Sequence, residues 1–532
     1  IQEVLGLLRR NKKKIKLDKM RDHFEFGKLY NTSKLNTGAS YNPTMEPFVV
    51  KWGDLVCQAT ENLTRTQPGS GKKGKIPVYT DPEGTCSWDT LMDSIMTQNI
   101  IGDTISIAGN LYVDGTITST ALTDNRVVIV GPGGILEDDA NLTIIPVSGY
   151  GNPDLIRQLI ASENPDAILH YTDPRFWQWL YNMEHEVRQN VPIFYYNIWD
   201  DLPYPRWNEP FYESCDLIMN ISRQTVNIVD NVCQKKPRTD WDNTYVPHGI
   251  NHKVFMPMDS LHENYDKLKK YKQHAFGNKQ YDFVVFWNNR NIRRKLPGDV
   301  IMAFKTFCDM LPKDKSKKCA LVMHTQPVDD NGTDLQAVVK ELCPDYDVIF
   351  SNEKLDNDQM CWMYNIADVT INIASNEGFG LGTCESLMCG TPIVVNVTGG
   401  LQDQCGFKKE DGSYLTVDDY TDEFQSNHRG RYKEHGDWAY PVFPSNLSLQ
   451  GSPPTPYIFD DRPSYEDAAD GLKHFYDMGA DERKECGEKG VEFVQMEEIG
   501  MTAENMSNRF IKDMDTAFEK WTPRKRFTLY KA

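Results

Sequence analysis

The feature that most limits how this chain can fold is a regular alternation of short apolar segments with amphipathic helices, which begins at Gly151. In the first repeat, the segment NPDLIRQLIASE from Asn152 spaces its apolar residues along one face of a helix, and the apolar strand AILH from Ala167 follows it. Strands and helices that alternate at this length predict a parallel sheet with helices on both faces. The expected fold class is therefore α/β.

The alternation runs through two stretches of the chain. It ends once at the segment YVPHGI and starts again at the strand DFVVFWNNR, so we predict two α/β domains, at residues 148–250 and 251–510. A length of 532 residues agrees with more than one core. Residues 406–463 are polar, contain several prolines and lack clear periodicity, and we expect an insertion that serves as a functional loop or a lid. The amphipathic end of the chain predicts a helix at residues 511–532.

The front of the chain has a different composition. Residues 1–75 are rich in Lys and Arg and stay unassigned, whereas no Lys or Arg occurs from Ile76 to Asn125. Residues 76–147 alternate apolar and polar residues between Gly-Asn, Asp-Gly and Gly-Gly turns, which predicts short strands joined by hairpins. This segment resembles small β modules of bacteriophage structural proteins. In an alternative interpretation, RVVIVGPGG is the first strand and glycine turn of a nucleotide-binding domain, but no amphipathic helix follows it.

Composition excludes several classes of function. A formal charge of −18 argues against a general nucleic-acid binder, so any phosphate must be bound by a local site. No apolar run reaches the roughly 18 residues of a membrane span. The basic first residues have no apolar core behind them, so we expect no secretory signal. The 12 cysteines form no CxxC pair and no zinc pattern, which favours reduced thiols in the cytoplasm.

A glycine-rich turn provides such a local site. The segment SNEGFGLGTCESLMCGTPIVV, which begins at Ser375, places Gly378, Gly380 and Gly382 between a strand and a helix that starts at about Leu381. Glycines let the backbone approach a ligand closely, and the first amides of a helix attract an anion. The turn therefore predicts a diphosphate site that does not depend on net charge.

Two carboxylates flank this turn. Glu377 and Glu385 are separated by seven residues. A carboxylate beside a phosphate is repelled unless it binds hydroxyl groups, so the pair indicates a sugar and a ribose on either side of the diphosphate. In the alternative interpretation, Glu385 only complements the helix dipole and Glu377 is a solvated loop residue.

These motifs together resemble the retaining glycosyltransferases of family 4. The resemblance is carried by E-x7-E with its glycines, by CGTPIVV and TGG after it, by NNRNIRRK, by YVPHGINHKVF and by PDAILHYTD, and it covers about residues 150–405. It implies the GT-B architecture, which has two facing Rossmann-like domains. Here these would carry a β-rich N-terminal segment and a C-terminal crossing helix. It also implies transfer of a hexose from a nucleotide-diphosphate sugar to an acceptor hydroxyl with retention of configuration.

The resemblance assigns roles to residues. It implies that Arg290 and Lys295 neutralise the diphosphate of the donor, that Glu377 contacts the donor sugar, and that Glu385 contacts the ribose. His170 would lie near the reacting carbon or, alternatively, be an ordinary buried strand residue. The remaining donor-binding positions are those of the two glycine turns and the helix start, namely Gly378, Phe379, Gly380, Leu381, Gly399 and Gly400.

An aromatic and acidic segment follows the strand that ends near residue 197. Its sequence YYNIWDDLPYPRWNEPFY suits the stacking of sugar rings, so Trp199, Asp200 and Trp207 are candidates for acceptor binding, with core packing as the alternative. Neither Asp200-Asp201 nor Asp513-Met-Asp515 forms a convincing metal motif, and enzymes of the resembling architecture usually need no metal.

The expected function is thus a metal-independent, retaining hexosyltransferase without a cofactor, located in the cytoplasm, or in the host cytoplasm if the chain is of phage or viral origin. Its donor would be a UDP- or GDP-hexose and its acceptor a glycan, a protein or a small molecule, with no nucleic-acid partner. One rival is a non-catalytic sugar-nucleotide or glycan-binding module in a viral structural protein. A second is a phosphorylase that carries pyridoxal phosphate. The first strand, glycine loop and helix of the resembling family are not recognisable in residues 1–147.

Overall fold

The computed structural model describes residues 4–8, 129–130, 136–137, 150–233 and 241–525. The chain divides into two units, of which Asn31–Gly149 is one and Ile1–Tyr30 with Tyr150–Ala532 is the other. In the smaller unit, β2 (Ile129–Val130) and β3 (Leu136–Glu137) pair antiparallel. The other expected strands of residues 76–147, and the basic region beyond Leu8, lie outside the described residues.

The first parallel sheet forms the N-terminal Rossmann-like domain, with strand order β1-β4-β5-β6-β7. Strands β4 to β7 are parallel and adjacent in chain order, whereas β1 adds to β4 in the antiparallel direction. Its strands are β1 (Val4–Leu8), β4 (Ala167–Tyr171), β5 (Ile193–Asn197), β6 (Leu217–Asn220) and β7 (Asn243–Tyr245), and its helices are α5 (Pro153–Glu163), α6 (Gln178–Asn182), α7 (Glu184–Val187), α8 (Glu209–Glu213) and α9 (Arg223–Val232).

Local sequence explains most of these elements. Every residue of β4, β5 and β6 is buried, as the continuous apolar runs predict for strands covered on both faces. Helix α5 begins where the side chain of Asn152 accepts hydrogen bonds from two backbone amides, ahead of Pro153. The tryptophan-rich segment RFWQWLYNMEHEVRQN does not form one continuous helix, because it divides into a 3-10 turn, α6 and α7, with non-helical backbone at Met183.

The second parallel sheet forms the C-terminal Rossmann-like domain, with strand order β10-β9-β8-β11-β12-β13. Its strands are β8 (Phe283–Asn288), β9 (Cys319–His324), β10 (Asp347–Ser351), β11 (Val369–Asn372), β12 (Ile393–Asn396) and β13 (Ala439–Val442). Its helices are α10 (Tyr265–Phe276), α11 (Pro297–Asp309), α12 (Lys313–Ser316), α13 (Leu335–Leu342), α14 (Asn357–Ile366), α15 (Leu381–Met388), α16 (Leu401–Gln404), α17 (Tyr465–Asp477) and α18 (Gly479–Gln495).

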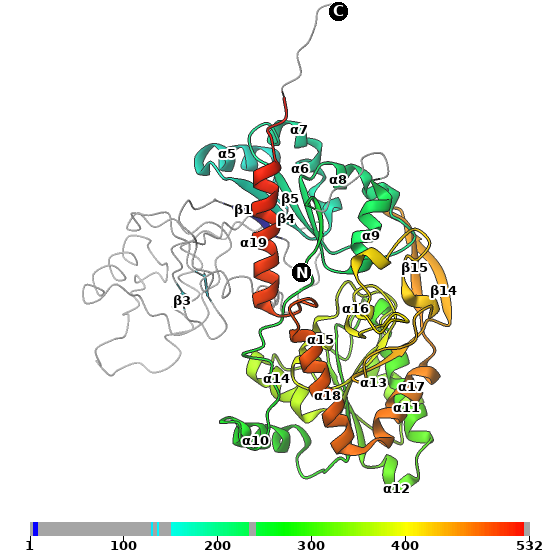
Figure 1. The fold of residues 1–532 in the computed structure, drawn as a ribbon. Helices are drawn as coiled ribbons and strands as arrows, with labels where there is room; N and C mark the ends of the chain where they lie inside the picture. The colour runs from blue at the N-terminus through cyan, green and yellow to red at the C-terminus, as the bar shows by residue number, and fades with distance from the viewer. Residues whose placement is uncertain (1–3, 9–128, 131–135, 138–149, 234–240, 526–532) are drawn as a thin grey trace, which may run out of the picture. The chain divides into compact units, whose positions relative to one another are not determined.

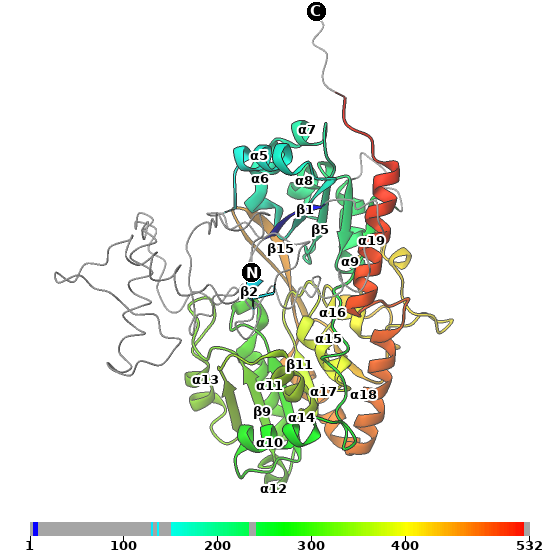
Figure 2. The same ribbon diagram turned by 90° about the vertical axis from the view of Figure 1, so that its left-hand side faces the viewer.

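Helices cover both faces of this sheet (Figure 1 and Figure 2). Phe286 of β8 packs in the hydrophobic cluster that includes residues of α14 and α15, whereas its neighbours Val285 and Trp287 pack in the cluster of α11 and α17. This alternation is expected of a strand whose successive side chains point to opposite faces. The two parallel sheets with their helices confirm the predicted α/β class with two Rossmann-like domains.

The strand order reverses between β8 and β11, which are neighbours in the sheet. In open α/β sheets a ligand binds beyond the carboxyl ends of the strands at such a topological switch point. The loop after β8 carries Arg290 and Lys295, and the loop after β11 carries Glu377 and the glycine turn. The fold therefore brings the two main motifs of the sequence to one place.

The insertion expected at residues 406–463 is more ordered than its sequence suggests. Strand β13 extends the main sheet beside β12, and β14 (Asn446–Ser452) and β15 (Thr455–Arg462) form an antiparallel hairpin. The periodicity was hidden because β13 contains Pro441 and because every residue of β14 is exposed or only partly buried. The expectation of a loop over this whole segment is corrected accordingly.

The C-terminal helix is also shifted from its expected bounds of 511–532. Helix α19 spans Ala503–Lys520, and the described residues after it are not helical. Thr502 caps its start by accepting a hydrogen bond from the backbone amide of Asn505. The helix lies along the sheet of the N-terminal domain, where Phe510 packs against Tyr196 and Phe518 against Phe194 (Figure 1). The chain thus crosses back to the N-terminal domain, as predicted.

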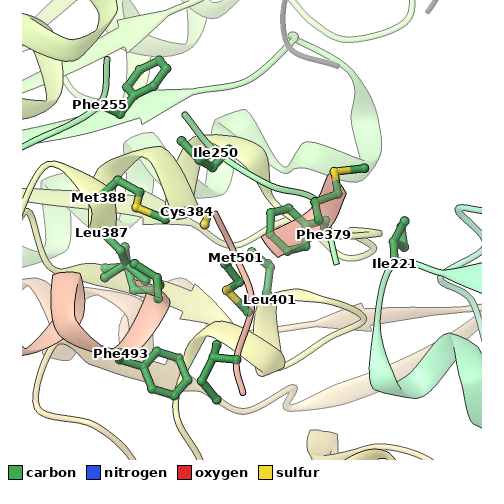
Figure 3. Close-up of a cluster of buried hydrophobic side chains, with 14 of the residues drawn as sticks. Ile221, Ile250, Phe255, Phe379, Cys384, Leu387, Met388, Leu401, Phe493 and Met501 are labelled. Carbon is green, nitrogen blue, oxygen red and sulfur yellow. The ribbon is translucent and has the colours of Figure 1, made fainter. Parts of the chain in front are cut away.

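One hydrophobic cluster contains residues of both Rossmann-like domains. Figure 3 shows Phe379 and Leu401 of the C-terminal domain in this cluster with Ile221, which follows β6, and Met501, which precedes α19. The glycine turn that contains Phe379 is therefore anchored in the core at the junction of the two domains.

Candidate active site

An ion pair between Lys295 and Glu377 lies at the switch point. Lys295 ends a 3-10 turn after β8, and its Nζ contacts Oε2 of Glu377, which follows β11. Both side chains are largely buried, at 8% and 14% exposed, and Asn372 Nδ2 donates to the same carboxylate at 3.4 Å. The structure thus brings together two residues to which the family resemblance assigned the diphosphate and the sugar of a donor.

Burial and charge act in opposite directions on this pair. Burial lowers the pKa of Lys295, and the carboxylate of Glu377 partly offsets that effect. Burial also acts to raise the pKa of Glu377, but the positive charges of Lys295 and Arg294 outweigh it, so the pKa is lowered below its ordinary value. Glu377 is therefore ionised at neutral pH and holds the lysine ammonium beside it.

Arg290 is placed differently. Its side chain is 64% exposed, and its Nε donates to Asp329 at 2.9 Å in the loop after β9. The structure therefore does not bring Arg290 into the ion pair of Lys295 and Glu377.

The two glycine turns pack directly on each other. Gly399 has φ of +45°, and a Cβ added there would lie 2.2 Å from the carbonyl oxygen of Glu377. The backbone amide of Gly400 donates to that same oxygen at 3.0 Å. Gly380, with φ of +88°, precedes the first residue of α15, Leu381. The second turn can therefore pack against Glu377 only if Gly399 has no side chain, and this requirement does not depend on a ligand.

Phe379 serves the core as well as the turn. Its ring is 2% exposed, and its carbonyl accepts a hydrogen bond of 2.7 Å from Gln404 Nε2. His248, from the YVPHGI segment, packs edge-on against that ring at 5.3 Å and shares a hydrogen bond of 2.9 Å with Tyr196. Burial lowers the pKa of His248 to about 4, although the charge of Glu377 acts to raise it. The charge of Glu377 therefore acts on the imidazole of His248, which lies beside the candidate site.

Glu385 lies on the first turns of α15 in a hydrogen-bonded chain. Tyr364 donates its hydroxyl proton to Glu385 Oε2 at 2.8 Å, and Asn288 Nδ2 donates to the Tyr364 oxygen at 2.9 Å. Burial raises the pKa of Glu385 to about 7, although the hydrogen bond from Tyr364 acts to lower it. A carboxyl group that is half protonated near neutral pH can both donate to and accept from a ribose hydroxyl.

The raised pKa of Glu385 makes stability depend on pH. The folded state favours the protonated form of Glu385. The contribution of this group to the stability of the fold is therefore complete below the ordinary pKa of 4.5 and is lost as pH rises towards about 7. We expect Glu385→Gln to stabilise the fold by about 1–3 kcal/mol at pH 8 and to change little at pH 4.5. Urea unfolding of both proteins at the two pH values measures this, with the exposed Glu410→Gln as control. If Glu385→Gln changed the free energy of unfolding equally at both pH values, the raised pKa of Glu385 would be contradicted.

Of the predicted acceptor residues, Asp200 reaches the site. Its Oδ2 lies 3.9 Å from where a Cβ on Gly378 would be, and its Cβ 3.5 Å from one on Gly399. Burial raises the pKa of Asp200, as does the negative charge of Glu377, while the charge of Arg294 opposes the shift. Asp200 therefore faces the glycine turns from the N-terminal domain.

Of the two tryptophans, Trp207 packs against the inserted hairpin and Trp199 packs against Trp207. The ring of Trp207 contacts Tyr457 of β15 edge-on at 4.4 Å, and the ring of Trp199 contacts Trp207 at 5.8 Å. The backbone amide of Phe459 also donates to the carbonyl of Leu202 at 2.6 Å. The aromatic segment is thus joined to the C-terminal domain by β15, and its role in acceptor binding stays a prediction.

His170 lies on β4 among aromatic rings of the N-terminal domain. Its Nδ1 is 2.7 Å from the Tyr181 hydroxyl, and its ring stacks on Tyr195 at 5.1 Å. Burial lowers the pKa of His170 to about 3, so the ring is neutral at physiological pH. These contacts belong to the core of that domain, and the role near the reacting carbon stays a prediction.

Sequence reasoning missed three residues around Glu377. His248 and Asn376 are parts of motifs that the sequence analysis quoted, and Arg294 lies between the two cations that it chose. Asn376 Nδ2 donates to the Phe459 carbonyl at 2.7 Å and to the carboxylate of Asp201, so it joins the hairpin, the N-terminal domain and the glycine turn. Its place directly before Glu377 was the only signal available in the sequence.

The ten cysteines in the described part of the chain are all free thiols, and all are buried. Among the described residues, no group of three or more His, Cys, Asp or Glu side chains is arranged to hold a metal ion. Within those same ranges no helix is both long and apolar enough to pass through a bilayer.

The sequence matches no protein-family model and no curated protein sequence. Solved structures with a similar fold include a glycosyltransferase from Rickettsia africae, at 15% identity, covering 71% of this chain and 86% of the other, with a TM-score of 0.47. HepE of Anabaena in complex with UDP-glucose has 13% identity, covers 68% and 82%, and has a TM-score of 0.47. Sucrose-phosphate synthase from Thermosynechococcus elongatus has 14% identity, covers 69% and 77%, and has a TM-score of 0.45. Similarities of this size do not by themselves assign a function to the chain.

Proposed function

We propose that this protein is a glycosyltransferase that moves a hexose from a nucleotide-diphosphate sugar to an acceptor hydroxyl with retention of configuration. The observation that carries the proposal is the buried ion pair of Lys295 and Glu377, placed at a topological switch point beside the glycine turn. A buried cation at the carboxyl end of a parallel sheet suits a phosphate, and a carboxylate next to it suits sugar hydroxyls.

The reaction breaks the bond between the anomeric carbon and a phosphate oxygen, where negative charge develops. Lys295 stabilises that charge electrostatically, and it needs no metal ion to do so. When the donor binds, its diphosphate replaces Glu377 as the partner of the Lys295 ammonium. The carboxylate of Glu377 then accepts hydrogen bonds from the sugar hydroxyls. Glu385 binds the ribose.

The acceptor hydroxyl attacks the anomeric carbon from the side that the phosphate leaves, and its proton passes to the departing phosphate oxygen. Asp200 is the acceptor-side group in this proposal, because it faces the glycine turns from the N-terminal domain. The contacts between the two domains exclude water, which would otherwise hydrolyse the donor. Membership of family 4, a UDP- or GDP-hexose as donor and a cytoplasmic location belong to the same proposal.

Donor binding and donor turnover test the proposal together. Thermal shift and hydrolysis are measured with UDP-, GDP- and ADP-hexoses on the wild type, on Glu377→Gln and on the exposed control Glu410→Gln. We expect one nucleotide series to stabilise the wild type and the control and to be hydrolysed by both, with both effects lost in Glu377→Gln. NMR of the product sugar then reports the anomeric configuration.

The absence of any shift or turnover with every donor would overturn the proposal. It would leave the non-catalytic glycan-binding module of a viral structural protein as the better account. Inversion at the anomeric carbon would overturn only the retaining mechanism.

A further inference from the structure

We propose that Asn376 is a positioning residue of the candidate site, which fixes Glu377 of the C-terminal domain relative to Asp200 of the N-terminal domain. The inserted hairpin of β14 and β15 holds Asn376 in place. This inference rests on the proposed function, because it concerns how the carboxylate for the donor sugar and the acceptor-side carboxylate are held relative to each other. The two strands, drawn in orange, reach from the C-terminal domain to the N-terminal domain (Figure 1 and Figure 2).

Both donor hydrogens of the Asn376 amide are used in contacts with other parts of the chain. The residue is 4% exposed. Its Nδ2 donates to the carboxylate of Asp201 in the N-terminal domain and, at 2.7 Å, to the carbonyl of Phe459 in β15. An asparagine amide offers two such hydrogens. The side chain is therefore clamped between the N-terminal domain and the hairpin.

The hydrogen bond between Asn376 and Asp201 joins the neighbours of two residues of the proposed mechanism. Asn376 directly precedes Glu377, and Asp201 directly follows Asp200. The negative charge of Glu377 acts to raise the pKa of Asp200, so the two carboxylates are near each other. A shift of Asn376 against Asp201 would therefore change the separation of the groups proposed to bind the donor sugar and the acceptor.

Phe459 of β15 binds both domains through its own backbone. Its amide donates to the carbonyl of Leu202 at 2.6 Å, and its carbonyl accepts the hydrogen bond from Asn376. Its ring packs against the hydrophobic cluster of the N-terminal domain. The segment of Asp201 and Leu202, the residue Asn376 and the hairpin thus form a closed set of contacts, in which each member binds the other two.

Asp461 fixes the same strand to the C-terminal domain. Its backbone amide donates to the carbonyl of Ser375 at 3.1 Å, and its carbonyl accepts a hydrogen bond of 2.7 Å from Asn396 Nδ2. Its Oδ2 accepts a hydrogen bond of 2.7 Å from the Thr398 hydroxyl. The loops after β11 and β12, which carry the two glycine turns, are therefore both held by β15.

Positioning can be distinguished from general stabilisation because two measurable steps depend on different contacts. A nucleoside diphosphate carries no hexose for Glu377 to bind, whereas the reaction needs the hexose in a defined place, and a misplacement of about 1 Å can cost roughly 100-fold in rate. Loss of the Asn376 side chain should therefore lower kcat far more than it weakens nucleoside diphosphate binding. A residue that only stabilised the fold would leave both unchanged or impair both.

Donor hydrolysis and nucleotide binding, measured on the full chain, test the proposal. Steady-state hydrolysis of the UDP- or GDP-hexose that the wild type prefers gives kcat, and isothermal titration with UDP and GDP gives Kd. For Asn376→Ala we expect a kcat about 10- to 100-fold below that of the wild type. Its Kd for the nucleoside diphosphate should stay within about threefold. Asn446→Ala, at an exposed asparagine of β14, is the matched control and should change neither.

An exchange of the two side chains guards against misfolding. Asn376→Asp places a carboxylate against that of Asp201 and should lose as much kcat as Asn376→Ala does. Asp201→Asn in the same chain restores a hydrogen bond between the domains with donor and acceptor reversed, so the double variant should be at least about threefold faster than Asn376→Asp. A double variant that is no faster would contradict a positioning role for this hydrogen bond.

Two further results would overturn the inference and leave the proposed function intact. One is a kcat of Asn376→Ala within about threefold of the wild type, and the other is a nucleoside diphosphate Kd that weakens as much as kcat falls. If Asn376→Ala does not fold, the comparison of Asn376→Asp with the double variant decides. A wild type that neither binds a nucleoside diphosphate nor hydrolyses a donor would overturn both proposals.

Discussion

Lys295→Met should reduce donor turnover by about 10²- to 10³-fold, because in the proposed mechanism Lys295 is the electrostatic group that stabilises the departing phosphate. It should also destabilise the fold by about 3–5 kcal/mol, since it leaves the buried carboxylate of Glu377 without its ion-pair partner. Steady-state kinetics with the preferred nucleotide sugar and urea unfolding of the same preparation measure the two effects.

A double variant separates catalysis from folding. Lys295→Met combined with Glu377→Gln removes both charges, so it should recover part of the lost stability but none of the lost turnover. Lys354→Met, at an exposed lysine, is the matched control and should behave as the wild type does. Turnover of Lys295→Met within a few-fold of the wild type would contradict the role of this lysine.

Asp403→Ala should have the largest effect on stability away from the candidate site. Asp403 lies on α16, and its Oδ2 accepts a hydrogen bond of 3.0 Å from the backbone amide of Arg223 at the start of α9. The Arg223 guanidinium is 3.4 Å from Oδ1, which makes an ion pair without a well-formed hydrogen bond. The side chain of Asp403 is 0% exposed and that of Arg223 is 8% exposed. Their contact joins the two Rossmann-like domains.

Removing one partner leaves a buried charge uncompensated, so we expect Asp403→Ala to cost about 3–5 kcal/mol. Urea unfolding at neutral pH measures the loss, and limited proteolysis shows whether the connection between the domains opens first. Asp266→Ala, which breaks an exposed ion pair with Lys269, should leave stability almost unchanged. Equal stability of the two variants would show that the contact between α9 and α16 does not hold the domains together.

Much of the fold was predictable because it depends on local patterns. Strands β4, β5 and β6 are continuous apolar runs, and β8 lies within DFVVFWNNR, where the alternation starts again. The hairpin of β14 and β15 was not, because its strands are exposed along much of their length and lack the alternation of a half-buried strand. The bounds of α19 were missed at both ends, since an amphipathic pattern does not show where a cap begins the helix.

The candidate site was predictable where one motif contained its chemistry. Glu377, Glu385 and the glycines share one stretch of sequence, whereas Lys295 was assigned only through the family resemblance, and the structure places it beside Glu377. The contacts of Trp207 could not be derived, because its partner Tyr457 comes from a hairpin far along the chain. The surroundings of His170 could not be derived either, because a histidine buried in a domain core and one that faces a ligand give the same pattern in the sequence.

The sequence by itself determined the two α/β domains, the glycine turn and the two carboxylates that flank it. These depend on periodicity and on residue types that are close together along the chain. Only the tertiary structure decided which cations face Glu377. Arg290, Arg294 and Lys295 all belong to one short loop, and their side chains are directed by contacts with Asp329, Asn376 and Glu377, which come from distant segments. Side-chain direction in a loop is set by such long-range contacts, because no repeating backbone geometry imposes it.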